Sequence, residues 1–92
     1  MRVVATVHFT RNLHRHVECP PERVDAATAR EALDGYFALH PAVRGYVLDE
    51  QGTLRTHVNV FVDGIQVADR ATLGDPVDAH TEIHVIQALS GG

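Results

Sequence analysis

The chain ends in Gly91-Gly92, and the chemistry open to these residues is that of a terminal carboxylate. An α-carboxylate is ionised at neutral pH and is a poor electrophile, so it must be activated before a nucleophile can attack it. Glycine has no Cβ, which allows the backbone of such a tail to enter a narrow active-site channel. We therefore expect Gly92 to supply the reacting carboxylate and Gly91 to supply rotational freedom. The alternative is a frayed terminus without function.

Seven histidines form the second group with chemical potential. The i, i+2 spacing of His14 and His16 places them on one face of an extended segment, and His57 and His84 fall in segments that can be adjacent strands, so two-ligand metal sites are conceivable. No cysteine or carboxylate completes a recognised zinc spacing. We interpret the histidines as polar strand residues and expect no bound metal or cofactor.

Other residue types do not indicate an enzyme. The sequence contains no paired-carboxylate motif, no Ser-His-Asp order and no phosphate-binding loop. Cys19 is interpreted as a small buried hydrophobic residue, and Tyr36 and Phe37 as core residues rather than ligand contacts.

Length and composition predict one soluble domain. Ninety-two residues, 45% of them hydrophobic, suffice for a single compact core. A net charge of -4 and scattered arginines argue against nucleic-acid binding, and no apolar run is long enough for a membrane span. The first residues alternate too early with polar side chains for a signal peptide, and the single cysteine fits a reducing compartment, so we expect a cytoplasmic protein. All eight basic residues are arginine, so no copy can be attached to another through a lysine side chain.

The elements that must position the tail begin with a predicted hairpin. Residues 2–10 alternate between apolar and polar side chains with the period of a strand. Residues 14–19 are predicted to continue as the second strand, which ends at Pro20-Pro21. Thr28 and Glu31 then form a capping box at the start of a helix that is expected to reach Leu39, before Pro41.

The second half of the sequence reads as further strands. Residues 45–55 are predicted to form strand, turn and strand, with Gln51-Gly52 at the turn. Residues 57–63 form the next strand, with Val58, Val60 and Val62 inward, and the turn Asp63-Gly64 leads to a short return strand. After an irregular crossover over 73–79, residues 82–89 form the last strand, which buries Ile83 and Val85.

This order predicts an α+β domain of the β-grasp type, with a mixed sheet of four to five strands and one main helix packed on one face. We assign residues 1–89 to this domain and residues 90–92 to a flexible tail.

At this point the sequence resembles the ubiquitin-like sulfur carriers of the MoaD and ThiS type, over nearly the whole chain. LRTHVNVFVDG at 54–64 is similar to a strand and turn of that family, and DAHTEIHVIQALSGG at 78–92 is similar to its final turn, strand and tail. The chain departs from the family pattern at His80, where the family has a turn glycine, at Gln87 and at Ser90.

The resemblance implies a function. In this family an adenylating enzyme, similar to the ubiquitin activators, uses ATP to convert the terminal carboxylate to an acyl adenylate. Sulfur transfer then yields a thiocarboxylate on Gly92, which donates sulfur to a synthase in molybdopterin, thiamin or cysteine biosynthesis. The alternative functions are a protein modifier that is conjugated to target lysines, and a non-catalytic interaction module. The free protein is expected to be a monomer.

A carrier also needs a surface that its activating enzyme can recognise. Phe61 falls on the outward side of its strand, and Ile86 and Ala88 alternate with the buried residues of the last strand. Together they are predicted to form an exposed apolar patch, which Leu89 and Ser90 extend toward the tail. The alternative is that a loop of the same chain covers this patch.

Overall fold

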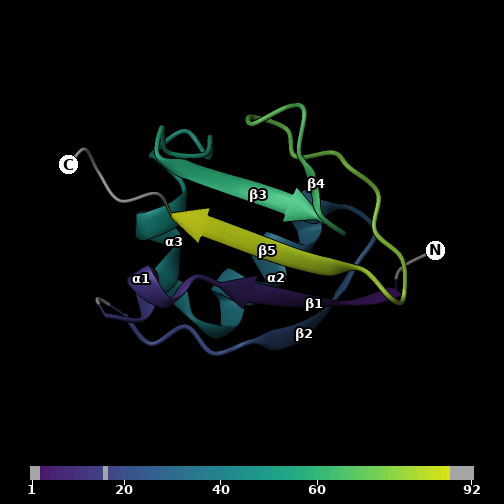
Figure 1. Ribbon diagram of the computed structural model, residues 1–92, viewed down its shortest axis with the longest axis horizontal. Helices are drawn as coiled ribbons and strands as arrows, with labels where there is room; N and C mark the ends of the chain where they lie inside the picture. Colours follow the sequence, from purple (N-terminus) through teal and green to yellow (C-terminus); the bar gives the residue numbers. More distant parts are fainter. Residues whose placement is uncertain (1–2, 16, 88–92) are drawn as a thin grey trace.

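A computed structural model describes residues 3–15 and 17–87, and these residues form a five-stranded mixed sheet whose two longer helices lie on one face (Figure 1). The strand order is β2-β1-β5-β3-β4. The central strands β1 (Val3–Phe9) and β5 (Glu82–Gln87) are parallel, and every other neighbouring pair is antiparallel. The remaining strands are β2 (Glu22–Ala26), β3 (Val58–Val62) and β4 (Ile65–Gln66). This topology is the predicted β-grasp.

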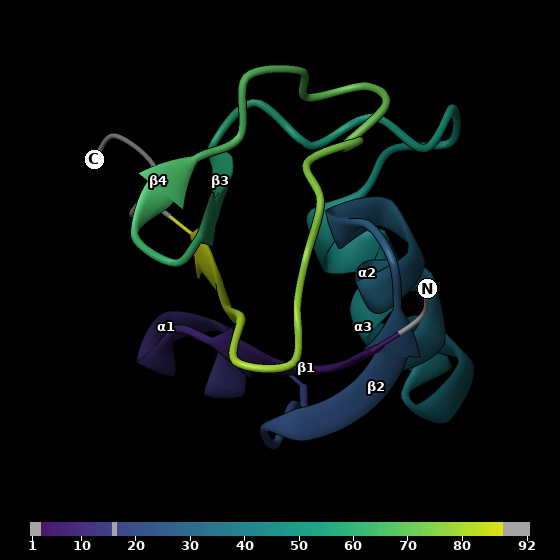
Figure 2. The same cartoon turned by 90° about the vertical axis from the view of Figure 1, so that its right-hand side faces the viewer.

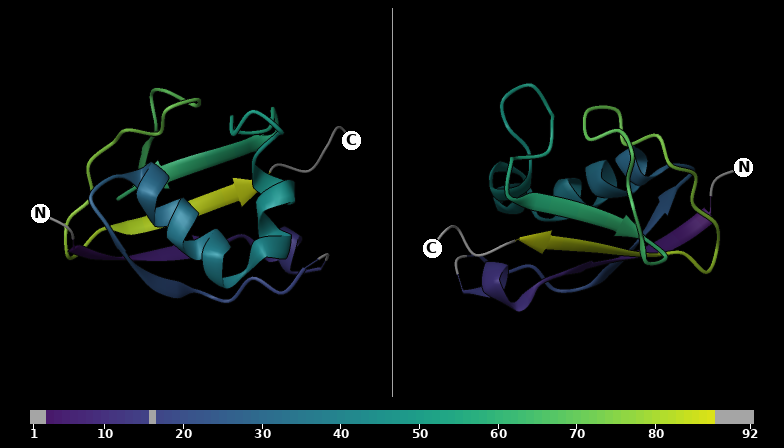
Figure 3. Two further views of the ribbon diagram at one scale, coloured as in Figure 1. Left: turned by 180° about the vertical axis from the view of Figure 1, so that it is seen from behind. Right: turned by 45° about the horizontal axis from the view of Figure 1, so that its top comes forward.

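The helices α2 (Ala29–Leu39) and α3 (Pro41–Val47) cover one face of the sheet, as Figure 2 and the left panel of Figure 3 show. Alternate residues of the strands point toward these helices and are buried. The core of the described part includes Ala5, Val7, Val24, Leu33, Tyr36, Phe37, Val58, Val60, Ile83 and Val85. Burial of these apolar side chains is the main stabilising term of the fold.

The predicted capping box begins α2. Thr28 Oγ1 accepts a hydrogen bond from the backbone N–H of Glu31, and Glu31 Oε1 accepts one from the N–H of Ala27. These bonds satisfy two backbone donors near the helix start that the helix itself leaves without partners. The prediction that Tyr36 and Phe37 belong to the core is confirmed, since both side chains are buried.

The predicted position of the second strand is wrong. Arg11–His14 forms a helical turn, α1, and β2 begins at Glu22, after the two prolines rather than before them. Prolines lack the N–H that a sheet ladder requires, so pairing with β1 starts only once Pro20 and Pro21 have passed. Leu13 in the helical turn is buried in the core. The antiparallel pairing of the first two strands is nevertheless confirmed.

The prediction of two strands over residues 45–55 is also wrong. Pro41 stands at the first turn of α3, where its missing N–H costs nothing, and Val43 and Val47 share the buried side of that helix. Only a single bridge, between Leu48 and Leu54, joins the segments on either side of the following turn. The turn itself is confirmed, since Gly52 adopts the positive φ of 81° that glycine tolerates.

The later elements agree with the sequence. Asp63 and Gly64 both have positive φ, 50° and 83°, as a tight hairpin turn with matching twist requires. Ile83 and Val85 on β5 are buried as predicted. Over the residues that the structure describes, no helix has the length and apolar character that crossing a membrane demands.

Candidate functional site

The sheet face opposite α2 and α3, here called the outer face, carries two of the predicted docking residues, Phe61 and Ile86. In Figure 1 this face is turned toward the viewer, and α2 and α3 lie behind it. Its side chains alternate with the buried ones along each strand, so the strand periodicity alone decides which residues reach it. The central part of the outer face is formed by Thr6 and His8 of β1, Glu82, His84 and Ile86 of β5, and Asn59 and Phe61 of β3.

The structure brings Phe61 and Ile86 together as diagonal neighbours. Phe61 pairs with His84 and Asn59 pairs with Ile86 across β3 and β5. Ile86 is 38% exposed, whereas Phe61 is half-buried. The two apolar side chains thus alternate with the imidazole of His84 and the amide of Asn59. The described residues of the outer face therefore form no continuous apolar patch.

The rest of the predicted site follows β5 in sequence. Ala88, Leu89, Ser90, Gly91 and Gly92 lie outside the described residues, and so does the predicted tail of residues 90–92. Gln87 is the last residue described, and five residues separate it from the chain end at a maximum extended reach of about 17 Å.

The end of β5 is tied to the end of β1. The backbone N–H of Thr10 donates to the carbonyl of Val85 at 3.1 Å, and the N–H of Gln87 donates to Thr10 Oγ1 at 3.3 Å. Because the two strands are parallel, both run toward the same edge of the sheet. The final strand therefore leads toward residues 88–92 from a fixed point in the middle of the sheet.

A further feature of this edge was missed by the sequence analysis. An open pocket beside the end of β1 is lined by Phe9, Arg11 and His14, so two side chains with cationic potential stand near the point from which the chain continues to Gly92. The sequence does place Arg11 directly after a predicted strand. If that strand is parallel to the last one, the two strands end at the same edge of the sheet, and Arg11 then lies near the end of the last strand. The order of strands in the sheet is not visible in the sequence.

His57 directly precedes β3, and β3 is the neighbour of the strand that carries His84. His57 lies four residues before Phe61, the residue that pairs with His84, so His57 and His84 are not partners across the sheet. His14 is exposed on α1, and His16 lies outside the described residues. His84 instead stacks on His8, with ring centroids 4.7 Å apart.

Cys19 is a buried residue, as predicted. Its side chain is fully enclosed by the core, and burial raises the pKa of its thiol. Because the thiolate is the nucleophile, this environment leaves Cys19 unreactive.

A mixed sheet with one main helix across it, and a central last strand that leads toward a Gly-Gly sequence, defines a ubiquitin-like β-grasp protein. The comparison with family models gave no match. Over 73 residues the chain is 36% identical to small archaeal modifier protein 1 of Haloferax volcanii, a match that covers 76% of this chain and 79% of that protein. The chain therefore belongs to the family of that modifier protein, within the ubiquitin-like carriers of the MoaD and ThiS type that its sequence resembles.

Solved structures agree with this assignment. The crystal structure of small archaeal modifier protein 1 (SAMP1) from Haloferax volcanii superposes on this chain with a TM-score of 0.82 at 29% identity. The match covers 97% of this chain and 99% of that one. The solution structure of SAMP1 from Methanosarcina acetivorans gives a TM-score of 0.79 at 18% identity, over 100% and 99%. The crystal structure of the Amycolatopsis orientalis BexX/CysO complex gives 0.78 at 22% identity, over 96% and 99%. The last two similarities show the fold alone.

Proposed function

We propose that this protein is a sulfur carrier whose terminal Gly92 is adenylated by an ATP-dependent activating enzyme and then converted to a thiocarboxylate. The observation that carries the proposal is the position of β5: a central strand, hydrogen-bonded on both sides, leads toward the Gly-Gly sequence beside an outer face with Phe61 and Ile86. The domain supplies a rigid handle, and the residues after Gln87 supply the reach into another protein's active site.

The chemistry proceeds in balanced steps. The carboxylate of Gly92 attacks the α-phosphorus of ATP, which releases pyrophosphate and forms an acyl adenylate. The terminal sulfur of a persulfide then displaces AMP, and a second thiol cleaves the resulting acyl disulfide to leave the thiocarboxylate and a new disulfide. Every catalytic group in these steps belongs to partner proteins, so this chain acts as a protein cosubstrate and not as an enzyme.

Two partners follow from this scheme: an adenylating enzyme of the ubiquitin-activating type, which consumes the ATP, and a sulfur-accepting synthase that uses the thiocarboxylate in the synthesis of molybdopterin, thiamin or cysteine. The similar CysO chain was solved in a complex with BexX, which supports a partner for this fold. We place these steps in the cytoplasm and expect the carrier to be a monomer between encounters.

A second candidate function is favoured by the name of the relative, a modifier protein. The same acyl adenylate, passed to the amine of a target lysine, would form an amide instead of a thiocarboxylate. Since this chain has no lysine, its side chains cannot serve as acceptors for another copy. The first step is common to both functions, and the nucleophile decides between them.

Intact mass spectrometry after coexpression with an activating enzyme and a persulfide source tests the proposal. A gain of about 16 Da, oxygen replaced by sulfur at Gly92, is expected for the carrier. A variant that lacks Gly91 and Gly92 is the matched control and should show no gain. Conjugates of high mass with lysine-containing proteins, without the small gain, would instead establish the modifier. An unchanged mass with an enzyme that adenylates other family members would overturn both.

A further inference from the structure

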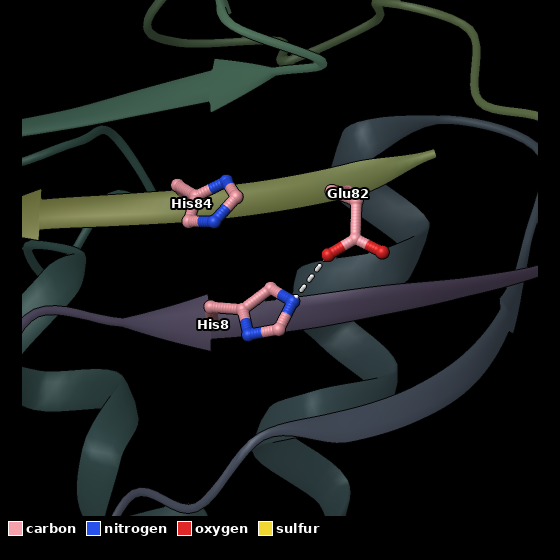
Figure 4. Close-up of side chains that lie close together, drawn as sticks. All are labelled: His8, Glu82 and His84. Carbon is pink, nitrogen blue, oxygen red and sulfur yellow. Dashed lines mark hydrogen bonds and ion pairs between the residues drawn. The ribbon is translucent and has the colours of Figure 1, made fainter. Parts of the chain in front are cut away.

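Three side chains with metal-binding atoms converge on the outer face: His8 of β1, and Glu82 and His84 of β5. Figure 4 shows His8 and His84 side by side across the two strands, with the Glu82 carboxylate directed toward His8. Their ligand atoms all lie within 4.8 Å of one another. No two of the three were paired by the sequence analysis.

The sheet register fixes this arrangement. His8 and His84 are direct partners in the parallel pair of β1 and β5, and Glu82 is the partner of Thr6, two residues earlier on the same side. Side chains at i and i+2 of a strand lie on the same face, so all three must share it. The backbone hydrogen bonds of two central strands hold these positions, and the cluster does not depend on a loop.

The contacts within the cluster leave its three side chains accessible to an ion from solvent. His8 Nε2 lies 2.6 Å from Glu82 Oε1, and the rings of His8 and His84 are stacked with an interplanar angle of 11°. The side chains of His8 and Glu82 are 30% and 53% exposed, and His84 is exposed as well. An ion can therefore enter from solvent, and side-chain rotations at the surface suffice to reorient the ligands.

Two imidazoles and one carboxylate are a ligand set suited to a divalent transition ion. Zinc binds imidazole nitrogen at about 2.0 to 2.1 Å and carboxylate oxygen at about 2.0 to 2.2 Å, which places tetrahedral ligands about 3.4 Å apart. The ligand atoms of the cluster lie at most 4.8 Å apart, so shifts of the order of an ångström bring them to the spacing of zinc ligands. Hard cations such as Mg²⁺ prefer oxygen ligands and are disfavoured here.

We propose that His8, Glu82 and His84 form a binding site for one zinc ion, or another divalent ion of similar preference, on the outer face. Three protein ligands leave the fourth coordination position toward solvent, where water or a donor group of a docked protein completes the tetrahedron. The proposal rests on the described residues of the sheet and is independent of the chemistry at Gly92.

Calorimetric titration of the full chain with Zn²⁺ tests the site, together with NMR of the backbone amides and imidazole rings. We expect one ion per chain, with shift changes centred on residues 8, 82 and 84. His84→Gln and Glu82→Gln should each weaken binding by about 100-fold or more, since even the loss of an outer-shell partner typically costs 10- to 100-fold. His57→Gln, which removes an exposed histidine outside the cluster, should bind as the wild type does.

Thermal unfolding of each variant checks that the domain stays folded, which the exposure of His84 and Glu82 leads us to expect. The proposal is overturned by the absence of binding to the wild type. It is equally overturned by unchanged affinity in His84→Gln and Glu82→Gln, or by shift changes centred on other histidines.

Discussion

Phe61 of β3 and His84 of β5 are direct partners across the outer face of the sheet. The aromatic residue proposed to dock the activating enzyme therefore borders the cluster proposed to bind metal. One surface, fixed by the register of three strands, carries both.

Replacing Phe61 with alanine should weaken recognition by the activating enzyme. The side chain is half-buried on the outer face, so its truncation removes contact area with a partner while the core residues Val58 and Val60 stay in place. We expect the KM for the carrier to rise by about tenfold with little change in kcat. This is the result of losing a contact that is made equally in the ground state and in the transition state. Adenylation kinetics, measured as pyrophosphate release, provide the readout.

Ile65→Ala is the matched control for this change. Ile65 is 72% exposed but pairs with Val62, at the end of β3 away from Gln87, so its loss should leave the KM unchanged. An unaltered KM in Phe61→Ala, or unfolding of that variant, would contradict a role of Phe61 in docking.

The helix cap at Thr28 gives a stability prediction. Thr28→Ala removes the oxygen that accepts the N–H of Glu31 and should lower the free energy of unfolding by about 1 kcal/mol. Thr28→Ser keeps the hydroxyl and should retain most of that stability. Chemical denaturation with equal m-values in the three proteins is the measurement, and equal stability of the alanine and serine variants would contradict the prediction.

Arg70 ties the segment after β4 back to the beginning of β3. Its guanidinium donates to Asn59 Oδ1 at 2.9 Å and to the carbonyls of Val58 and Arg55 at 2.7 and 2.6 Å. Arg70→Met should reduce the free energy of unfolding by about 2 kcal/mol, because several bonds to a charged donor are lost together. Arg70→Lys should recover only part of this loss, since an ammonium cannot reproduce the planar fork. Full recovery by lysine would show that charge alone matters.

We expect the free energy of unfolding to fall in acid because of two aspartates, Asp49 and Asp69. Backbone N–H groups lower the pKa of Asp49, chiefly that of Thr53, and lower the pKa of Asp69, chiefly that of Thr72. Since the folded pKa lies below the unfolded value of about 3.9, this stabilisation is present above that pH and disappears as the pH falls through the folded pKa. Asp49→Asn should therefore be less stable than the wild type at pH 7, and the difference should shrink below about pH 4. A difference independent of pH in urea denaturation would argue against the charged acceptor.

The sequence reliably predicted the elements whose signals are local. The alternation of Val58, Val60 and Val62, the Asp63-Gly64 turn and the capping box at Thr28 each depend on neighbouring residues, and the structure has all three. The position of β2 and the existence of α3 were predicted wrongly. Both errors concern what a proline permits after it, because β2 begins after Pro20-Pro21 and α3 begins at Pro41, whereas the sequence pattern marks these prolines only as the ends of the preceding elements.

By itself the sequence determined the β-grasp class, the Gly-Gly ending and the outward positions of Phe61 and Ile86, because periodicity assigns a strand residue to a face. Only the tertiary structure decided which outward residues meet. The parallel pairing of β1 with β5 joins segments more than 70 residues apart and sets His8 beside His84 and Glu82. That register joins strands from opposite ends of the described chain, and no local pattern in the sequence encodes it.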